Sequence, residues 1–180
     1  MLESLREGLS AAPQSADFVQ TFQPFGFSSS ERENGQMYLS LPACLRWDYE
    51  IPYAKSFLLC DSMIYTWNAG ESTGRRLHLE NGNEPGLDLL RLRIEKLRSR
   101  YTAEVQSLTD GSLEVILTPT AESVVLSEAR ITVDPLAYHL LALAYEDLEG
   151  NATRFEISGY RPLERLDKLV PPADLEWIDE

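Results

Sequence analysis

Basic side chains are scarce in this chain of 180 residues. Its 16 Lys and Arg residues stand against 29 Asp and Glu residues, which gives a formal net charge of -13 at pH 7. No basic stripe is available to neutralise phosphates, which argues against a nucleic-acid partner. The same charge disfavours lasting adhesion to anionic membranes. The acidic residues are spread along the chain, as is typical of a solvated surface.

Long apolar runs are also missing. No stretch approaches the roughly 18 consecutive apolar residues of a membrane span, and the opening MLESLREGLS lacks the apolar core of a signal peptide. Two alternatives stay open: a cytoplasmic protein, or one whose signal was removed. The composition, 43% apolar and 25% charged, is ordinary for a globular protein. We expect one domain over residues 1–180 that buries a core without metals.

Motifs of enzymes are not found either. The sequence has no G-x-S-x-G, H-E-x-x-H, P-loop or G-x-G-x-x-G pattern, so we expect no enzyme and no cofactor. His139, near Asp134, would be the best candidate for a base, but such a histidine is more often a surface strand residue. The two histidines are far from the two cysteines in the sequence, so we expect no metal site.

What the sequence does have is a pronounced alternation over residues 37–49, where odd positions are large and apolar. A period of two indicates a strand, and we predict a single one here, after a polar turn at 28–35. One face would carry Met37, Leu39, Leu41, Leu45, Trp47 and Tyr49. The other would carry Tyr38, Ser40, Cys44, Arg46 and Asp48. A row of such bulky apolar side chains must be covered by other apolar groups, and a bound ligand is one way to cover it.

The two cysteines lie on either side of a predicted hairpin turn, EIPY at 50–53. If Tyr49 is opposite Lys55, then Cys44 is opposite Cys60 and both point to the outer face. A disulfide would then form in an oxidising compartment. Two unpaired thiols are the other interpretation, and the sequence leaves both open.

Turn signals divide the rest of the chain into short segments. Helices are predicted at 2–12, with Leu2, Leu5 and Leu9 on one face, and at 87–100, with Leu87, Leu90, Ile94 and Leu97 on one face. Nine or ten strands follow one another as a meander, including 15–27, 55–60, 63–68, 74–80, 101–108, 112–119, 127–134, 138–147 and 151–160. A helical turn and a last edge strand are expected in 161–180.

These segments predict a mainly β fold with some α. The expected architecture is a single curved antiparallel sheet, an unclosed β-barrel, with two helices as a lid on its concave side. Ten strands offer more inward apolar surface than two modest helices can cover. We therefore expect a hydrophobic concave cavity, unless the curled sheet closes upon itself.

Seven segments follow one another in an order that is typical of a known family: FVQTF, LPACLRWDYEIPY, LLCDSMIYTWN, a helix after NEPG, LTP, EDLEGNATRFEIS and LVPPADLEWID. In this order they resemble the LolA family of periplasmic lipoprotein carriers. The corresponding family patterns include F-x-Q, R-P-x-x-F/L-R-W-x-Y-x-x-P, L-x-P and D-x-x-G-N-x-T-x-x-x-F. The resemblance covers nearly the whole chain, although no single motif is specific.

The resemblance implies a carrier that holds the acyl chains of a lipoprotein in its cavity. Such a carrier receives its cargo from an inner-membrane ABC transporter and passes it to the outer-membrane receptor LolB. It also implies a periplasmic location, with a signal peptide removed, and we expect a monomer. The residues predicted to line the cavity are Met37, Leu39, Leu45, Trp47, Phe57 and Leu59.

One position departs from the family pattern. Leu41 stands where the family commonly has an arginine that hydrogen-bonds the lid helices and holds the cavity shut. A leucine has no donors to offer backbone carbonyls, but it would pack against Leu87, Leu90 or Ile94. Arg46 is expected to point away from the cavity. The alternative to a carrier is a LolA-like lipid-sensing, lipoprotein-sensing or structural module without a transport role.

Overall fold

A single curved sheet forms most of the protein in its computed structural model, which describes residues 7–8, 10–79, 89, 94–120 and 126–180. The strands are β1 (Gln14–Gln23), β2 (Glu31–Ser40), β3 (Cys44–Ile51), β4 (Lys55–Cys60), β5 (Met63–Asn68), β6 (Thr73–His78), β7 (Tyr101–Ser107), β8 (Leu113–Pro119), β9 (Leu126–Asp134), β10 (His139–Asp147), β11 (Ala152–Pro162) and β12 (Glu176–Asp179). The helical elements are α2 (Ile94–Arg100) and the 3-10 helix η2 (Leu166–Leu169).

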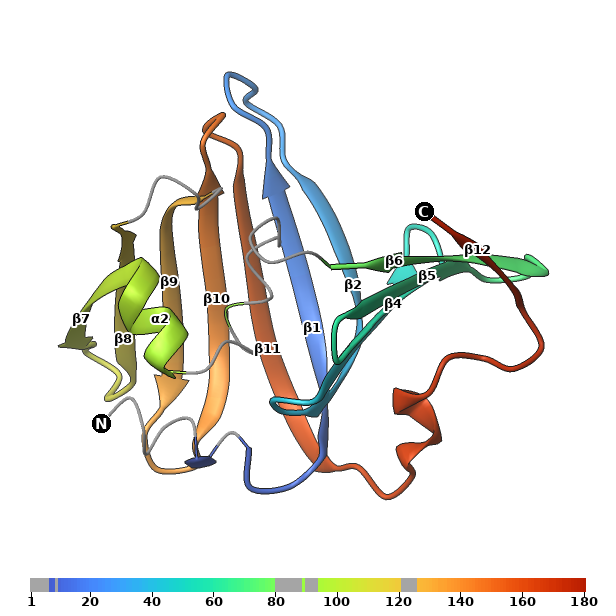
Figure 1. The fold of residues 1–180 in the computed structure, drawn as a ribbon. Coiled ribbons are helices and arrows are strands. Elements are labelled where there is room, and N and C mark those ends of the chain that lie inside the picture. The colour runs from blue at the N-terminus through green and yellow to red at the C-terminus, as the bar shows by residue number, and fades with distance from the viewer. Residues whose placement is uncertain (1–6, 9, 80–88, 90–93, 121–125) are drawn as a thin grey trace.

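The first strand of the chain lies near the centre of the sheet, and later strands are added on both sides of it. The strand order runs β12-β6-β5-β4-β3-β2-β1-β11-β10-β9-β8-β7, so β1 lies in the middle and the sheet does not close. The chain meanders from β1 to the β6 side, then continues at the opposite edge with α2 and β7 (Figure 1). From there it meanders back to β11, which pairs with β1. The predicted single meander is therefore two meanders that meet at the centre.

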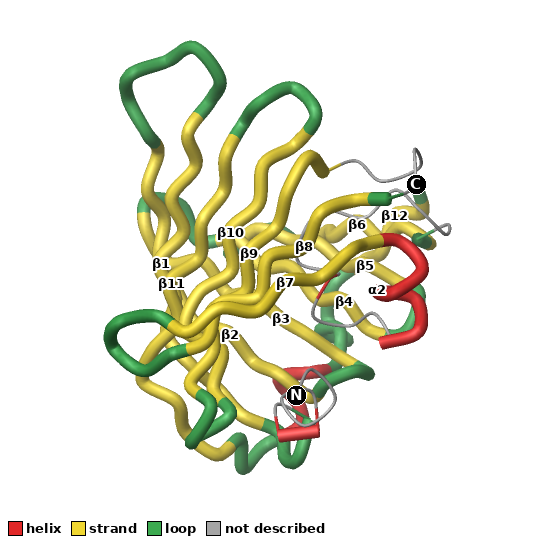
Figure 2. Tube along the Cα trace, turned by 90° about the vertical axis from the view of Figure 1, so that its left-hand side faces the viewer, coloured by secondary structure: helices red, strands yellow, loops and turns green. Residues whose placement is uncertain are grey.

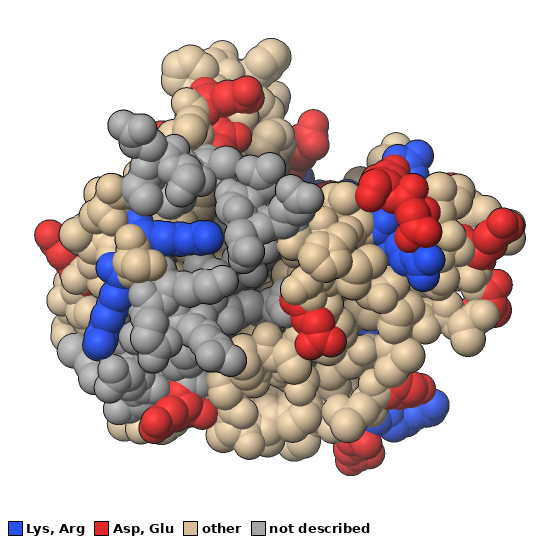
Figure 3. Space-filling model, viewed as in Figure 1, with Lys and Arg blue, Asp and Glu red and all other residues tan. Residues whose placement is uncertain are grey.

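β12 differs from the other strands because it pairs parallel to its neighbour β6. Two ion pairs join β6 to the C-terminal segment: Arg76 pairs with Asp179, and Arg75 with Glu180 at 3.0 Å. Figure 3 shows these acidic and basic side chains lying together where β6 and β12 meet. The expectation of an entirely antiparallel sheet is thus wrong at this one edge.

The prediction of one strand over 37–49 is also wrong, because the chain reverses at residues 41–43 between β2 and β3. The face assignment nevertheless holds. The hairpin pairs Ser40 with Cys44 and Leu39 with Leu45, so odd residues pair with odd residues on the same face. The alternation in the sequence is real, but it runs through a hairpin. The polar segment predicted as a turn at 28–35 likewise enters β2 from Glu31 onward.

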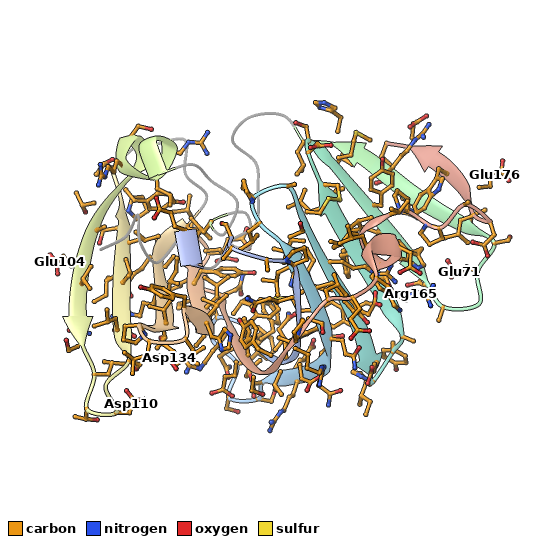
Figure 4. The ribbon with its side chains drawn as sticks, turned by 90° about the horizontal axis from the view of Figure 1, so that it is seen from below. Glu71, Glu104, Asp110, Asp134, Arg165 and Glu176 are labelled. Atoms are coloured by element: carbon orange, nitrogen blue, oxygen red, sulfur yellow. A yellow bond between two sulfur atoms is a disulfide. The ribbon has the colours of Figure 1, made fainter. Side chains whose placement is uncertain are left out.

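The curved sheet has an inner and an outer face (Figure 2). The inner face carries one large cluster of buried apolar residues drawn from β1–β4 and β7–β11. Among its least exposed members are Phe18, Phe155, Met37, Leu45, Leu140 and Leu143. Figure 4 shows side chains filling the space that the sheet encloses, with Glu71, Glu104 and Glu176 at the periphery. The core is therefore formed mainly by the sheet curving around itself.

The helical lid is not confirmed by the described residues. α2 has seven residues, and its Leu97 packs against the inner cluster, whereas η2 lies on the outer face against β2 and β3. Most of the predicted helix at 2–12 and the predicted lid residues Leu87 and Leu90 lie outside the described residues. The described helices include none that is long and apolar enough to cross a membrane.

Candidate functional site

The six residues predicted to line a cavity lie together on the inner face. They form two rows across β2, β3 and β4, because the register pairs Met37 with Trp47 and Trp47 with Phe57, and likewise joins the leucines. The second row is Leu39, Leu45 and Leu59. Five of the six are buried and Phe57 is half-buried. The structure thus brings the predicted set into one apolar patch, which we call the inner patch.

Aromatic rings continue the inner patch along β3 towards the centre of the sheet. The ring of Tyr49 meets Phe57 edge to face at 5.7 Å and Phe18 at 5.0 Å between centroids. Its hydroxyl donates a hydrogen bond to Oε1 of Gln20 at 2.5 Å. Burial raises the pKa of Tyr49. The phenol therefore stays neutral over the physiological pH range and adds no charge to the face.

Trp47 carries the one buried side-chain nitrogen or oxygen without a hydrogen-bond partner among the described residues. Its side chain is 3% exposed, yet the indole Nε1–H has no acceptor. Buried donors are nearly always paired, and an unpaired one costs about 1–3 kcal/mol. The inner patch therefore offers one directional donor in apolar surroundings.

Leu41, the predicted latch position, lies in the turn between β2 and β3 and is 8% exposed. It belongs to the same buried cluster as Leu89, which precedes α2. Ile94 begins α2, but its side chain, like the whole of Leu87 and Leu90, lies outside the described residues. A leucine at position 41 thus joins the inner core through apolar contact.

The outer face behind the inner patch is tied down by polar contacts. Arg46 pairs with Asp48 at 2.7 Å, donates to the carbonyl of Lys168 at 2.9 Å and lies over the ring of Trp67. Asp48 also accepts a hydrogen bond from Ser56 at 2.8 Å. As expected, Arg46 points away from the inner face. Sequence reasoning missed its role, which is to fix the η2 segment onto β3.

The cysteines lie on the same outer face. The register pairs Tyr49 with Lys55 and Cys44 with Cys60, as the predicted hairpin requires. In the structure the two sulfur atoms form a disulfide with an S–S distance of 2.01 Å. Both cysteines pack beside the outer cluster of Tyr38, Leu58 and Leu169. The covalent link therefore clamps β3 to β4 directly behind the inner patch.

His139, the residue considered as a base, packs against an aromatic ring. The ring of His139 stacks on Tyr160 with centroids 4.0 Å apart. The Asp134 carboxylate accepts hydrogen bonds from the backbone N–H groups of Leu136 and Ala137, and these bonds lower the pKa of Asp134. Asp134 is thus occupied in building the β9–β10 turn.

The fold is shared with solved structures at low sequence identity. An uncharacterised conserved protein from Thermus thermophilus superposes with a TM-score of 0.60 at 10% identity, covering 99% of this chain and 96% of that one. A LolA superfamily protein from Nitrosomonas europaea gives 0.52 at 10% identity, with coverage of 96% and 98%. MucB in its complex with MucA, from Pseudomonas aeruginosa, gives 0.52 at 12% identity. That alignment covers 98% of this protein but only 62% of the other chain.

Sequence comparison identifies the family itself. No curated protein sequence matches this chain significantly. The family model described as outer membrane lipoprotein carrier protein LolA matches residues 10–169, which include both meanders and the whole inner patch. The chain therefore belongs to the LolA family.

Proposed function

We propose that this protein is a periplasmic carrier that binds the acyl chains of a lipoprotein on its inner face and moves the lipoprotein from the inner to the outer membrane. The observation that carries the proposal is the composition of the inner cluster. Among its described buried members, only Leu41 and Leu89 come from outside the strands. A sheet face this large and this apolar suits a ligand that is itself apolar.

Acyl chains have the required chemistry. They offer no hydrogen bonds, and each methylene removed from water contributes roughly 0.8 kcal/mol. The side chains of the two rows of the inner patch supply apolar surface on three adjacent strands. No catalytic group is needed for binding and release. The proposal assigns the closure of the site to Leu41 with Leu87, Leu90 and Ile94. It assigns acyl-chain contact to Met37, Leu39, Leu45, Trp47, Phe57 and Leu59.

The proposed partners are an inner-membrane ABC lipoprotein-releasing transporter and the outer-membrane receptor LolB or its equivalent. A net charge of -13 would steer the carrier towards a basic surface on either of them. Steering of this kind weakens as salt screens the charges. If the association rate with the transporter does not change with ionic strength, electrostatic steering is wrong.

The test is co-expression in a bacterial periplasm with a lipidated lipoprotein or its unlipidated form, followed by native mass spectrometry. We expect a one-to-one complex with the lipidated form only. Phe57→Ala should weaken this complex, because Phe57 is a half-buried member of the inner patch. Tyr65→Ala is the matched control: it removes a half-buried aromatic residue from the adjacent strand β5, on the outer face. Capture of the unlipidated form would refute acyl-chain binding.

A second candidate function is a LolA-like lipid- or lipoprotein-sensing or structural module. It is favoured by the fold shared with MucB, which was solved in complex with MucA. Such a module would bind its ligand without handing it on. Stable binding of the lipidated form with no transfer to a LolB-type receptor would favour this function, and binding of neither form would exclude the carrier.

A further inference from the structure

Two hairpin tips present exposed apolar side chains at one end of the sheet. Phe25 and Phe27, in the β1–β2 loop, are 72% and 68% exposed, and Leu148, in the β10–β11 loop, is 69% exposed. In Figures 1 and 2 both loops project from the same end, and in Figure 1 they reach beyond the other strands. We call these three residues the apolar tip. They take no part in the inner patch.

The two loops are joined to each other. The backbone N–H of Phe25 donates a hydrogen bond to Oδ1 of Asn151 at 3.0 Å, which links the first loop to the second. The ring of Phe25 lies against Gly150, where a Cβ would come within 2.7 Å of it. Glycine is therefore required at position 150 both by its φ of +86° and by the ring above it.

Each loop is also fixed internally. The side-chain amide of Gln23 donates to the carbonyls of Phe27 and Ser29. In the second loop, Asp147 accepts from the backbone N–H groups of Glu149 and Asn151 at 2.9 Å and from the Asn151 side chain at 2.8 Å. The D-x-x-G-N segment therefore has a structural role, because it supports Phe25. Apolar side chains held out into solvent by so many polar contacts point to a binding surface.

We propose that the apolar tip inserts into the interfacial region of a zwitterionic lipid bilayer. A protruding tip fits a deformable headgroup layer without a complementary pocket, and aromatic side chains favour that region. Residues 24–30 and 147–151 contain no Lys or Arg, and the second loop carries Asp147 and Glu149. The contact is therefore apolar, and the acidic residues oppose anionic headgroups. A few apolar side chains give weak, reversible binding.

This inference is independent of the proposed carrier function, and its test uses no cargo. The full chain is mixed with vesicles of phosphatidylcholine, or of phosphatidylcholine with phosphatidylglycerol, and bound protein is measured by flotation. We expect weak binding to the zwitterionic vesicles and less to the anionic ones. Phe25→Ser/Phe27→Ser should lower binding at least about fivefold, because both apolar side chains leave the interface.

The control removes two other exposed apolar residues that lie outside the apolar tip. Leu136, at the β9–β10 turn, is 90% exposed and Leu166, in η2, is 57% exposed. Leu136→Ser/Leu166→Ser should bind vesicles like the wild type, and all variants should unfold at similar urea concentrations because these side chains are exposed. Equal binding by wild type and the Phe25/Phe27 variant, or equal loss in the control, overturns the proposal. If the Phe25/Phe27 variant binds vesicles normally but no longer captures a partner protein, the proposal is wrong and the tip contacts a protein instead.

Discussion

Phe18 and Tyr49 meet edge to face with ring centroids 5.0 Å apart, although they lie on β1 and β3, which are separated by β2. Strands two apart in a sheet lie about 9.6 Å apart. The residue between them on β2, paired with both, is Gly35. Because Gly35 has no side chain, the two rings can lean towards each other over it. This contact joins the inner patch to the centre of the sheet.

Replacing Gly35 by alanine should destabilise the protein. A Cβ at this position would lie 1.9 Å from the backbone oxygen of Asp48, so β2 and β3 would have to separate. We expect the free energy of unfolding to fall by more than about 2 kcal/mol in urea titrations. Gly70→Ala is the control. It has open space and a φ of +81°, so it should lose only about 1 kcal/mol. Equal losses would contradict the close approach.

Arg46→Ala should loosen the η2 segment. The Arg46 and Asp48 side chains are 11% and 20% exposed, and Arg46 also holds the carbonyl of Lys168. We expect a loss of about 2 kcal/mol in unfolding free energy and faster hydrogen exchange at 166–169. Arg154→Ala breaks a pair whose side chains are 53% and 59% exposed, and should change stability by less than about 0.5 kcal/mol. Unchanged exchange in Arg46→Ala would show that the segment is held by other contacts.

Removing the disulfide should destabilise the protein through the unfolded chain. Cys44 and Cys60 are 16 residues apart, and closing a loop of this size contributes about 3 kcal/mol in the chain-entropy model. Cys44→Ser/Cys60→Ser should therefore unfold at lower urea. Dithiothreitol should shift the wild type towards the variant and leave the variant unchanged. A shift of both by the reductant would mean that it acts elsewhere.

The free donor of Trp47 predicts how cargo binding can be observed. If the acyl chains occupy the inner patch, the ester or amide carbonyls that join them to the lipoprotein are acceptors for the Trp47 Nε1–H. In 1H–15N spectra the Trp47 indole signal should move when the protein binds its lipoprotein. The signal is assigned by its absence from the spectrum of Trp47→Phe. The Trp177 indole donates to the Pro172 carbonyl at 3.3 Å and should stay in place. Trp47→Phe should weaken retention about fivefold to tenfold, the loss of roughly one hydrogen bond.

Leu41→Arg tests the latch position. Leu41 is buried in the inner cluster, so a guanidinium there should cost at least about 1 kcal/mol of stability and alter the rate at which bound lipoprotein is released. Leu41→Met keeps the volume and should change neither property appreciably. Release is measured by the time course of cargo transfer from labelled carrier to an excess of unlabelled carrier. An unaltered release rate in Leu41→Arg would mean that position 41 does not control closure.

Much of the local structure was predictable because it depends on neighbours in the sequence. The predicted strands 55–60 and 63–68 have the bounds observed for β4 and β5. The facing of Met37 and Trp47 follows from alternation alone, and it survives the missed reversal at 41–43 because the hairpin pairs odd residues with odd residues. The opposition of Cys44 and Cys60 follows from the length of one turn. In each case the relevant partner lies within the same hairpin, at most 16 residues away.

Contacts between distant segments could not be predicted in this way. Neither the pairing of β1 with β11 nor the parallel return of β12 beside β6 leaves a periodic signal in the sequence. The same holds for Asn151, whose side chain supports Phe25 from 126 residues away. The alternation in the sequence therefore determined which side chains share a face. Only the curvature of the sheet decided which segments meet across that face, because burial and hydrogen bonding act between groups that the fold has first brought together.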